Sequence, residues 1–300
     1  MEAAVERGAL ATRCLLFAFV CVGKSVKRPF DSAPSPRRAR LNWASNLAFL
    51  TNMYRLLCIT AHPDDEAGAF GGTISLYAER GVEVSVVCLT AGTAARNRGA
   101  ARSDEELALI RTQEFQASCK FLGVTHEEVL GYLDSKLDRA NFHDVVGELV
   151  LRIRKLRPQV VLTFGQDGGL TGHADHAMAG AFATQAFEWA GRPDRYLEQL
   201  SSGLQQHAAQ KLYYATADFK LPDRMPTSPP TVTARVEVGA ERFERKIKAF
   251  MHHKTQEPLF ARLRMSLGGM PTTEMFHLAA TREPQEARLE GDLFEGVVSD

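Results

Sequence analysis

Residues 55–66 read RLLCITAHPDDE, a short apolar run that passes directly into a histidine and three acidic residues. An apolar run of this length, bounded by polar residues, is typical of a strand buried on both faces of a parallel sheet. Residues 82–90 (VEVSVVCLT) and 159–164 (QVVLTF) have a similar apolar, β-branched character, and they predict two further strands. Additional strands are expected over 129–133, 212–216 and 231–238.

Helices are expected between and after these strands, over residues 67–80, 143–156, 175–189 and 240–253. Ser103 and Glu106 form a capping box, which opens a further helix that runs to about Phe121. Alternating strands and helices are typical of a parallel sheet whose crossover helices pack on its faces. The sequence therefore predicts an α/β fold of three layers, with a mostly parallel sheet and helices on both faces.

The composition is that of a chain with a sizeable core. Of its 300 residues, 45% are hydrophobic and 24% are charged, which excludes an intrinsically disordered chain. The formal net charge is +0, so no nucleic-acid partner is expected. The five cysteines are odd in number and form no C-x-x-C pair. We therefore expect buried, reduced thiols and a cytoplasmic protein.

The chain is expected to hold one main domain over residues 53–281, between two segments of different character. Residues 1–52 show no clear periodic pattern, and their apolar stretch Cys14–Val22 is shorter than the roughly 20 residues that a membrane-spanning helix needs. We expect a disordered extension or a start codon assigned too early; a signal peptide, a weak membrane anchor and a functional arm are the alternatives. No catalytic residue and no firm membrane association are expected there. Residues 282–300 carry six acids and two arginines, which predicts an acidic, loosely held tail.

Two clusters of polar residues follow two of the predicted strands. The first comes directly after residues 55–60 and contains His62, Asp64, Asp65 and Glu66. The second lies in GQDGGLTGHADHAM (165–178) and contains Asp167, His173, Asp175 and His176. Ligands of open α/β sheets bind beyond the carboxyl ends of the strands. We therefore expect both clusters to contribute to one site.

Imidazole and carboxylate groups together suit Zn²⁺, and catalytic zinc sites commonly use three protein ligands and leave one position for water. His62, Asp65 and His176 can supply this set, although Fe²⁺ suits the same donors. Asp64 can then accept the proton of the attacking water, and His173 can stabilise the oxyanion or protonate the leaving amine. Each motif alone also fits a helix N-cap. Two such motifs about 110 residues apart, both at strand ends, favour a metal site.

AHPDDE (61–66) and GHADH (172–176), each following a strand, resemble the LmbE/PIG-L family of zinc-dependent N-acetylglucosaminyl deacetylases. The resemblance runs through most of residues 54–280. RTQE (111–114) and KIKAFMHHKTQ (246–256) resemble two further motifs of that family. Because both halves occur in the right order and spacing, the resemblance is specific.

The resemblance implies a Rossmann-like sheet that binds zinc and no nucleotide. It implies the same metal ligands, base and acid that the residues themselves indicate, and it further implies that Asp175 orients His173. Ala174 stands where the family usually has proline. This difference should loosen the loop slightly without changing the chemistry.

Three further residues are candidate substrate contacts. Arg111 is expected to reach the site from its helix, and Asp134 follows the strand expected over 129–133. His253, near the end of the last predicted helix, is expected to close the pocket over the substrate. The basic loop Arg96–Arg102 is either solvated or placed to meet an acidic group of the substrate.

These residues predict hydrolysis of an N-acetyl amide on a glucosamine-type sugar conjugate, releasing acetate and a free amine. Two alternatives stay open: an amidase that acts on another amide, such as a thiol-sugar conjugate, and a non-catalytic sugar-binding module. No G-x-G-x-x-G follows the first strand, which argues against a nucleotide-binding module. Mg²⁺-dependent phosphotransfer is disfavoured because Mg²⁺ prefers oxygen ligands. The sequence leaves open the exact sugar and the oligomeric state, including a homo-oligomer.

Overall fold

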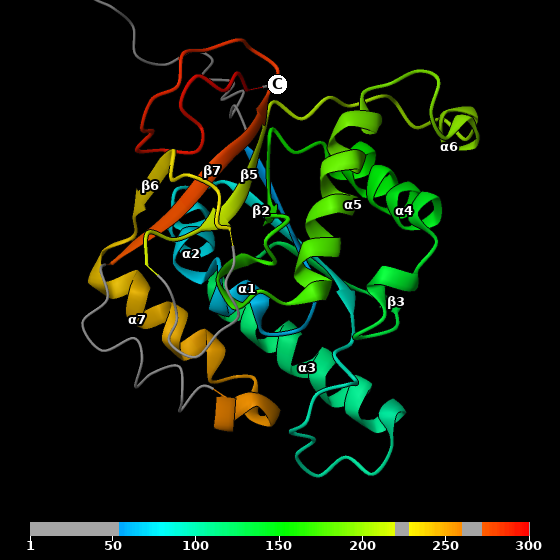
Figure 1. The fold of residues 1–300 in the computed structure, drawn as a ribbon, viewed down its shortest axis with the longest axis vertical. Coiled ribbons are helices and arrows are strands. Elements are labelled where there is room, and N and C mark those ends of the chain that lie inside the picture. The colour runs from blue at the N-terminus through cyan, green and yellow to red at the C-terminus, as the bar shows by residue number, and fades with distance from the viewer. Residues whose placement is uncertain (1–53, 220–227, 260–271, 300) are drawn as a thin grey trace, which may run out of the picture. The chain divides into compact units, whose positions relative to one another are not determined.

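The computed structural model describes residues 54–219, 228–259 and 272–299, which contain one seven-stranded sheet (Figure 1). The strand order is β3-β2-β1-β4-β5-β7-β6. The first five strands in this order are parallel, and β7 pairs antiparallel with both β5 and β6. The strands are β1 (Arg55–Thr60), β2 (Glu83–Thr90), β3 (His126–Tyr132), β4 (Val160–Phe164), β5 (Lys211–Thr216), β6 (Ala234–Glu237) and β7 (Thr273–Thr281).

Helices cover both faces of this sheet, so the domain has three layers (Figure 1). α4 and α5 pack together on one face, while α1, α2 and α3 contact α7 on the other. The predicted α/β fold with a mostly parallel sheet is confirmed. Within the described ranges, no helix combines the length and apolar character needed to cross a bilayer. The helices are α1 (Asp65–Gly68), α2 (Gly71–Glu79), α3 (Asp104–Leu122), α4 (Phe142–Leu156), α5 (Ala174–Ala190), α6 (Leu197–Ser201) and α7 (Gly239–Phe250).

β1 is the centre of the core because it lies between two parallel neighbours. Its residues Leu56–Ile59 are at most 1% exposed, and Cys58 lies opposite Val86 of β2 and Leu162 of β4. The chain adds β2 and β3 on one side of β1 and then crosses to add β4 on the other. Such a reversal of strand order leaves a crevice at the carboxyl ends of the two central strands. In this protein those strands are β1 and β4.

The cysteines in the described residues match the expectation of buried thiols. Cys58, Cys88 and Cys119 are free and buried. Burial raises the pKa of each of these thiols well above its ordinary value, which keeps them protonated and unreactive. The expectations for residues 1–52 lie outside the described residues.

Local signals explain both ends of α3. The Ser103 hydroxyl accepts the Glu106 backbone N–H at 3.2 Å, as the capping box predicts, and the helix stops at Leu122, before Gly123, whose φ of 89° favours glycine. The last helix is shorter than predicted, since α7 ends at Phe250. His253 therefore lies in the turn that follows α7.

β7 is a strand that the sequence pattern did not predict. Its sequence, TEMFHLAAT, contains Glu and two Ala, which have low strand propensity, and shows no strict alternation. Pairing with β5 and β6 on both sides nevertheless holds it in the sheet. The strand expected over 231–238 forms only over Ala234–Glu237, as β6.

The expectation of a loosely held tail after Arg282 is wrong for the described residues. Glu290 is 1% exposed and accepts hydrogen bonds from the Lys211 ammonium, at 2.6 Å, and from the Tyr213 hydroxyl. Its carbonyl accepts the Arg235 backbone N–H at 2.9 Å, and Leu293 is fully buried. The acidic composition hid this role, because Glu290 is bound to a buried lysine instead of facing water.

Replacing Glu290 with glutamine should destabilise the fold. The change leaves the Lys211 ammonium buried without its counter-charge, which typically costs about 3 kcal/mol. Glu286→Gln, at an exposed position in the same segment, is the matched control and should change stability by less than about 0.5 kcal/mol. Urea unfolding of both variants measures the difference. Equal stability of the two variants would show that the tail does not hold the sheet.

Candidate active site

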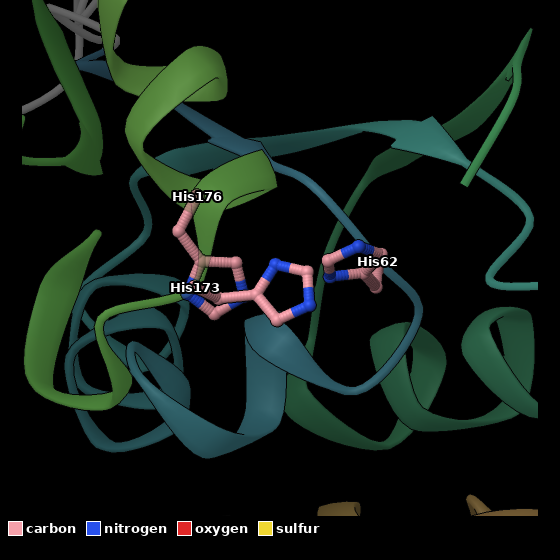
Figure 2. A group of neighbouring side chains, drawn as sticks. All are labelled: His62, His173 and His176. Atoms are coloured by element: carbon pink, nitrogen blue, oxygen red, sulfur yellow. The ribbon is translucent and has the colours of Figure 1, made fainter. Parts of the chain in front are cut away.

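The loops after β1 and β4 meet because these two strands are parallel neighbours. His62 lies two residues past β1, while His173 and His176 lie at the start of α5, which follows β4. Figure 2 shows the three imidazole rings gathered in one place. One nitrogen of each ring lies within 4.8 Å of the other two. The structure thus brings the two polar clusters of the sequence together.

Asp65 lies between two of these histidines. Its Oδ2 is 3.7 Å from His62 Nδ1, and its Oδ1 is 3.1 Å from His176 Nε2. The backbone N–H groups of Ala61 and His62 donate to Oδ2 at 3.1 and 2.9 Å, which fixes the carboxylate in place. Burial opposes ionisation, but His176 and His62 hold the pKa of Asp65 well below its ordinary value. Asp65 is therefore an anionic carboxylate held between two imidazoles.

The outer nitrogens of the two imidazoles have partners of their own. His62 Nε2 lies 3.1 Å from Asp134 Oδ1 and 3.3 Å from Asp175 Oδ2. His176 Nδ1 lies 3.3 Å from the Thr171 hydroxyl. Burial lowers the pKa of His62, but its bonds to the two outer carboxylates raise that pKa to about 10. These contacts leave His62 Nδ1 and His176 Nε2 directed toward Asp65.

The donor set fits a zinc ion. Metal-binding histidines usually donate their second N–H to a carboxylate or another acceptor, which sets the tautomer and turns the other nitrogen to the metal. His62 shows this arrangement, and the three residues offer two imidazole nitrogens and one carboxylate, as zinc prefers. All three are buried, between 7% and 8% exposed. His62, Asp65 and His176 could thus hold the metal.

Asp64 is held beside this set in an unusual backbone conformation. Its φ is 112°, and although it occupies the N-cap position of α1 its side chain makes no capping bond. Arg111 Nη2 donates to Asp64 Oδ2 at 3.0 Å and to the Pro63 carbonyl, and Nη1 donates to the Gly92 carbonyl at 2.6 Å. Burial, opposed by Arg111, raises the pKa of Asp64 to about 6. A side chain at Gly92 would overlap the guanidinium, since a Cβ there would lie 2.0 Å from Nη1.

His173 is fixed by the backbone of its own loop. The Asp175 backbone N–H donates to His173 Nδ1 at 3.2 Å, so the neutral ring carries its proton on Nε2. Partial burial, together with positive charge on His62 and His176, lowers the pKa of His173 and favours this neutral form.

The predicted role of Asp175 needs correction. Its carboxylate accepts the Ser135 backbone N–H at 2.7 Å and faces His62 Nε2, so it orients His62 instead of His173. The i, i+2 spacing of His173 and Asp175 could not distinguish a backbone contact from a side-chain contact. Asp175, at the start of α5 after β4, thus supports His62, from the loop after β1.

A cavity of about 470 Å³ opens at these residues, a size typical of small-molecule sites. Its polar lining includes Asp64, Asp65, Asp134, His173 and His176. Its apolar lining includes Phe164, Phe243, Phe250 and Met275. Arg111 also lines the cavity. The two predicted substrate contacts Arg111 and Asp134 therefore face the space where a substrate would lie.

His253, the third predicted substrate contact, is placed differently. Its side chain is fully buried, and its Nε2 lies 2.6 Å from Glu66 Oε1. Because α7 ends early, the following turn directs this side chain inward, and it is not among the described residues that line the cavity. Glu66 also accepts the Ser118 hydroxyl, at 2.6 Å. The sequence did not predict these contacts of Glu66 and Ser118. Glu66 could have been considered, because it directly follows the predicted ligand Asp65 in AHPDDE.

The chain resembles known deacetylases in sequence and structure. A family model described as GlcNAc-PI de-N-acetylase (PIG-L) matches residues 57–187. The diacetylchitobiose deacetylase of Thermococcus kodakarensis is 35% identical over 187 residues, covering 62% of this chain and 68% of that protein. The 1D-myo-inositol 2-acetamido-2-deoxy-alpha-D-glucopyranoside deacetylase of Actinosynnema mirum is 32% identical over 282 residues, covering 83% of this chain and 99% of that protein.

A solved structure supports the same relationship. The N,N'-diacetylchitobiose deacetylase from Pyrococcus horikoshii superposes with a TM-score of 0.62 and 26% identity, over 75% of this chain and 83% of that one. The family model, which matches residues 57–187, spans both AHPDDE and GHADH. By its motifs, its fold and these relatives, the chain belongs to the GlcNAc-PI de-N-acetylase (PIG-L) family.

Proposed function

We propose that this protein hydrolyses the N-acetyl amide of a glucosamine-type sugar conjugate and releases acetate and a free amine. The observation that carries the proposal is the position of Asp65, between His62 Nδ1 and His176 Nε2, with the Asp64 carboxylate on the adjacent residue lining the same cavity. The two relatives named above are deacetylases of acetamido sugars by name. The names of these relatives and the geometry around Asp64 and Asp65 both support hydrolysis of an N-acetyl amide.

His62, Asp65 and His176 would hold a zinc ion. When bound there, zinc would supply Lewis acidity and lower the pKa of a water molecule. Asp134 and Asp175 would keep His62 in the tautomer that presents Nδ1. A ferrous ion would suit the same donors.

Asp64 is the proposed general base. Its carboxylate would accept a proton from the water that attacks the amide carbonyl carbon, while Arg111 holds one of its oxygens. The same carboxyl group would return that proton to the amide nitrogen as the C–N bond breaks. The free amine and acetate then leave the cavity.

His173 is the proposed oxyanion stabiliser. Its Nδ1 is occupied by a backbone N–H, so Nε2 carries the proton that can be donated to the carbonyl oxygen as negative charge develops. A lowered pKa suits this role, because the ring stays neutral and its hydrogen stays on Nε2. Asp134 and Ser135, which line the same cavity, would contact the sugar hydroxyls.

A non-catalytic sugar-binding module is the less favoured account. Strained backbone conformations persist where the surrounding structure enforces them, and they concentrate at active sites. Asp64 has such a conformation and a dedicated arginine. A binding module would need neither. An amidase acting on another amide would use the same residues, and a substrate panel distinguishes it.

Metal binding should depend on the three proposed ligands. Protein purified without added metal should carry about one zinc or iron per chain, and His176→Ala should lose it because a three-residue site loses a ligand. Mass spectrometry of the native proteins gives the metal content. Thr184→Val, farther along the same helix, is the control and should keep the metal. Retention of the metal by His176→Ala would contradict the proposed ligand set.

Asp64→Asn should abolish most turnover without removing the metal. An amide cannot accept the proton, so kcat should fall at least about 100-fold, while KM and metal content change little. Amine release from N-acetylglucosamine, diacetylchitobiose and N-acetylglucosaminyl-inositol measures this, beside a peptide amide. If the wild-type protein turned over only the peptide amide and none of the sugars, an amidase that acts on another amide would be favoured. Undiminished turnover by Asp64→Asn would exclude Asp64 as the base.

A further inference from the structure

Asp64 depends on its neighbours for its backbone conformation. A φ of 112° with ψ of −22° lies in a region that residues with a side chain rarely adopt. Such a conformation persists only where the surrounding structure enforces it. Arg111 holds the carboxylate of Asp64 and the preceding carbonyl, but it does not contact the Asp64 N–H. A different residue must therefore accept the Asp64 N–H.

Glu66 supplies this contact. Its Oε2 accepts the Asp64 backbone N–H at 2.9 Å. Its Oε1 accepts the Ser118 hydroxyl at 2.6 Å and lies 2.6 Å from His253 Nε2. The side chains of Glu66, Ser118 and His253 are all fully buried. A buried carboxylate is costly unless it is fully hydrogen-bonded, and these three donors account for both of its oxygens.

One stripe of α3 organises the network. Arg111, Glu114 and Ser118 are three and four residues apart, so they lie on the same face of the helix. Arg111 bonds Asp64, and Ser118 bonds Glu66. Glu114 accepts the backbone N–H and the hydroxyl of Thr255 at 2.9 and 2.6 Å, which fixes the turn that carries His253.

We propose that Glu66 is a positioning residue for Asp64, and that His253 and Ser118 hold Glu66 in place. This inference rests on the proposed function, in which Asp64 is the base. Asp64 lines the cavity, whereas Glu66 and His253 do not, so neither can touch the substrate. Glu66 fixes the backbone of Asp64 while Arg111 fixes its carboxylate. Together they keep the carboxylate directed into the cavity.

The role assigned to Glu66 is that of a hydrogen-bond acceptor, which glutamine can partly reproduce. The amide oxygen of glutamine can accept the Asp64 N–H, and its NH₂ can donate to the Ser118 oxygen and to His253 in its other neutral tautomer. Methionine has a similar shape and no such acceptor. Comparing the two replacements therefore separates the hydrogen bond from the volume of the side chain.

Steady-state kinetics of Glu66→Met and Glu66→Gln, with metal content and thermal melting of each, test the proposal. A displacement of about 1 Å at a reacting group can cost about 100-fold in rate. We expect Glu66→Met to lose kcat on that scale, with KM and metal content near those of the wild type. Glu66→Gln should restore most of the loss. A general structural defect would instead raise KM or release the metal.

Two further variants keep the test decisive if Glu66→Met does not fold. His253→Gln can still donate to Glu66 from nearly the same position, whereas His253→Leu cannot. We expect the leucine variant to lose kcat and the glutamine variant to recover it. Wild-type kcat in both Glu66→Met and His253→Leu, or equal losses in the glutamine and apolar variants, would overturn the proposal. Wild-type protein that turns over no acetamido sugar would instead contradict the proposed function.

Discussion

Two parallel strands that lie side by side end at the same edge of their sheet, and this constraint places the whole site. β1 and β4 are such neighbours, so the loop carrying His62 and Asp65 must share its space with the loop carrying His176. The reversal of strand order between them leaves room above both ends. The meeting of His62 and Asp65 with His176 depends on this pairing. The helices on the two faces then fill in the supporting contacts.

Burial makes charge compensation the second constraint. An ionised carboxylate inside a protein requires hydrogen bonds or a counter-charge. Asp65 receives two backbone N–H groups and two imidazoles, Glu66 receives Ser118, His253 and the Asp64 N–H, and Glu290 receives Lys211. The first two networks share the turn at residues 61–66. Their fixed geometry pre-organises the cavity before a substrate enters.

The fold and the meeting of the two clusters could be predicted from the sequence, because apolar runs followed by polar residues mark strand ends. The contacts between side chains of different helices and loops could not be predicted in this way. The inward turn of His253 depends on where α7 stops and on the bond between Glu114 and Thr255. The contact of Asp175 with His62 depends on how two loops approach each other. β7 and the buried tail escaped prediction because their stability comes from pairing and burial instead of local propensity.

The most direct test of the central claim is anomalous X-ray diffraction at the zinc edge from crystals of the metal-loaded protein. We predict one strong peak within bonding distance of His62 Nδ1, His176 Nε2 and an oxygen of Asp65. A peak at His62 Nε2, between Asp134 and Asp175, would contradict it, because those groups would then be the ligands and not the support. Absence of any peak at this edge of the sheet would likewise contradict a metal-dependent deacetylase.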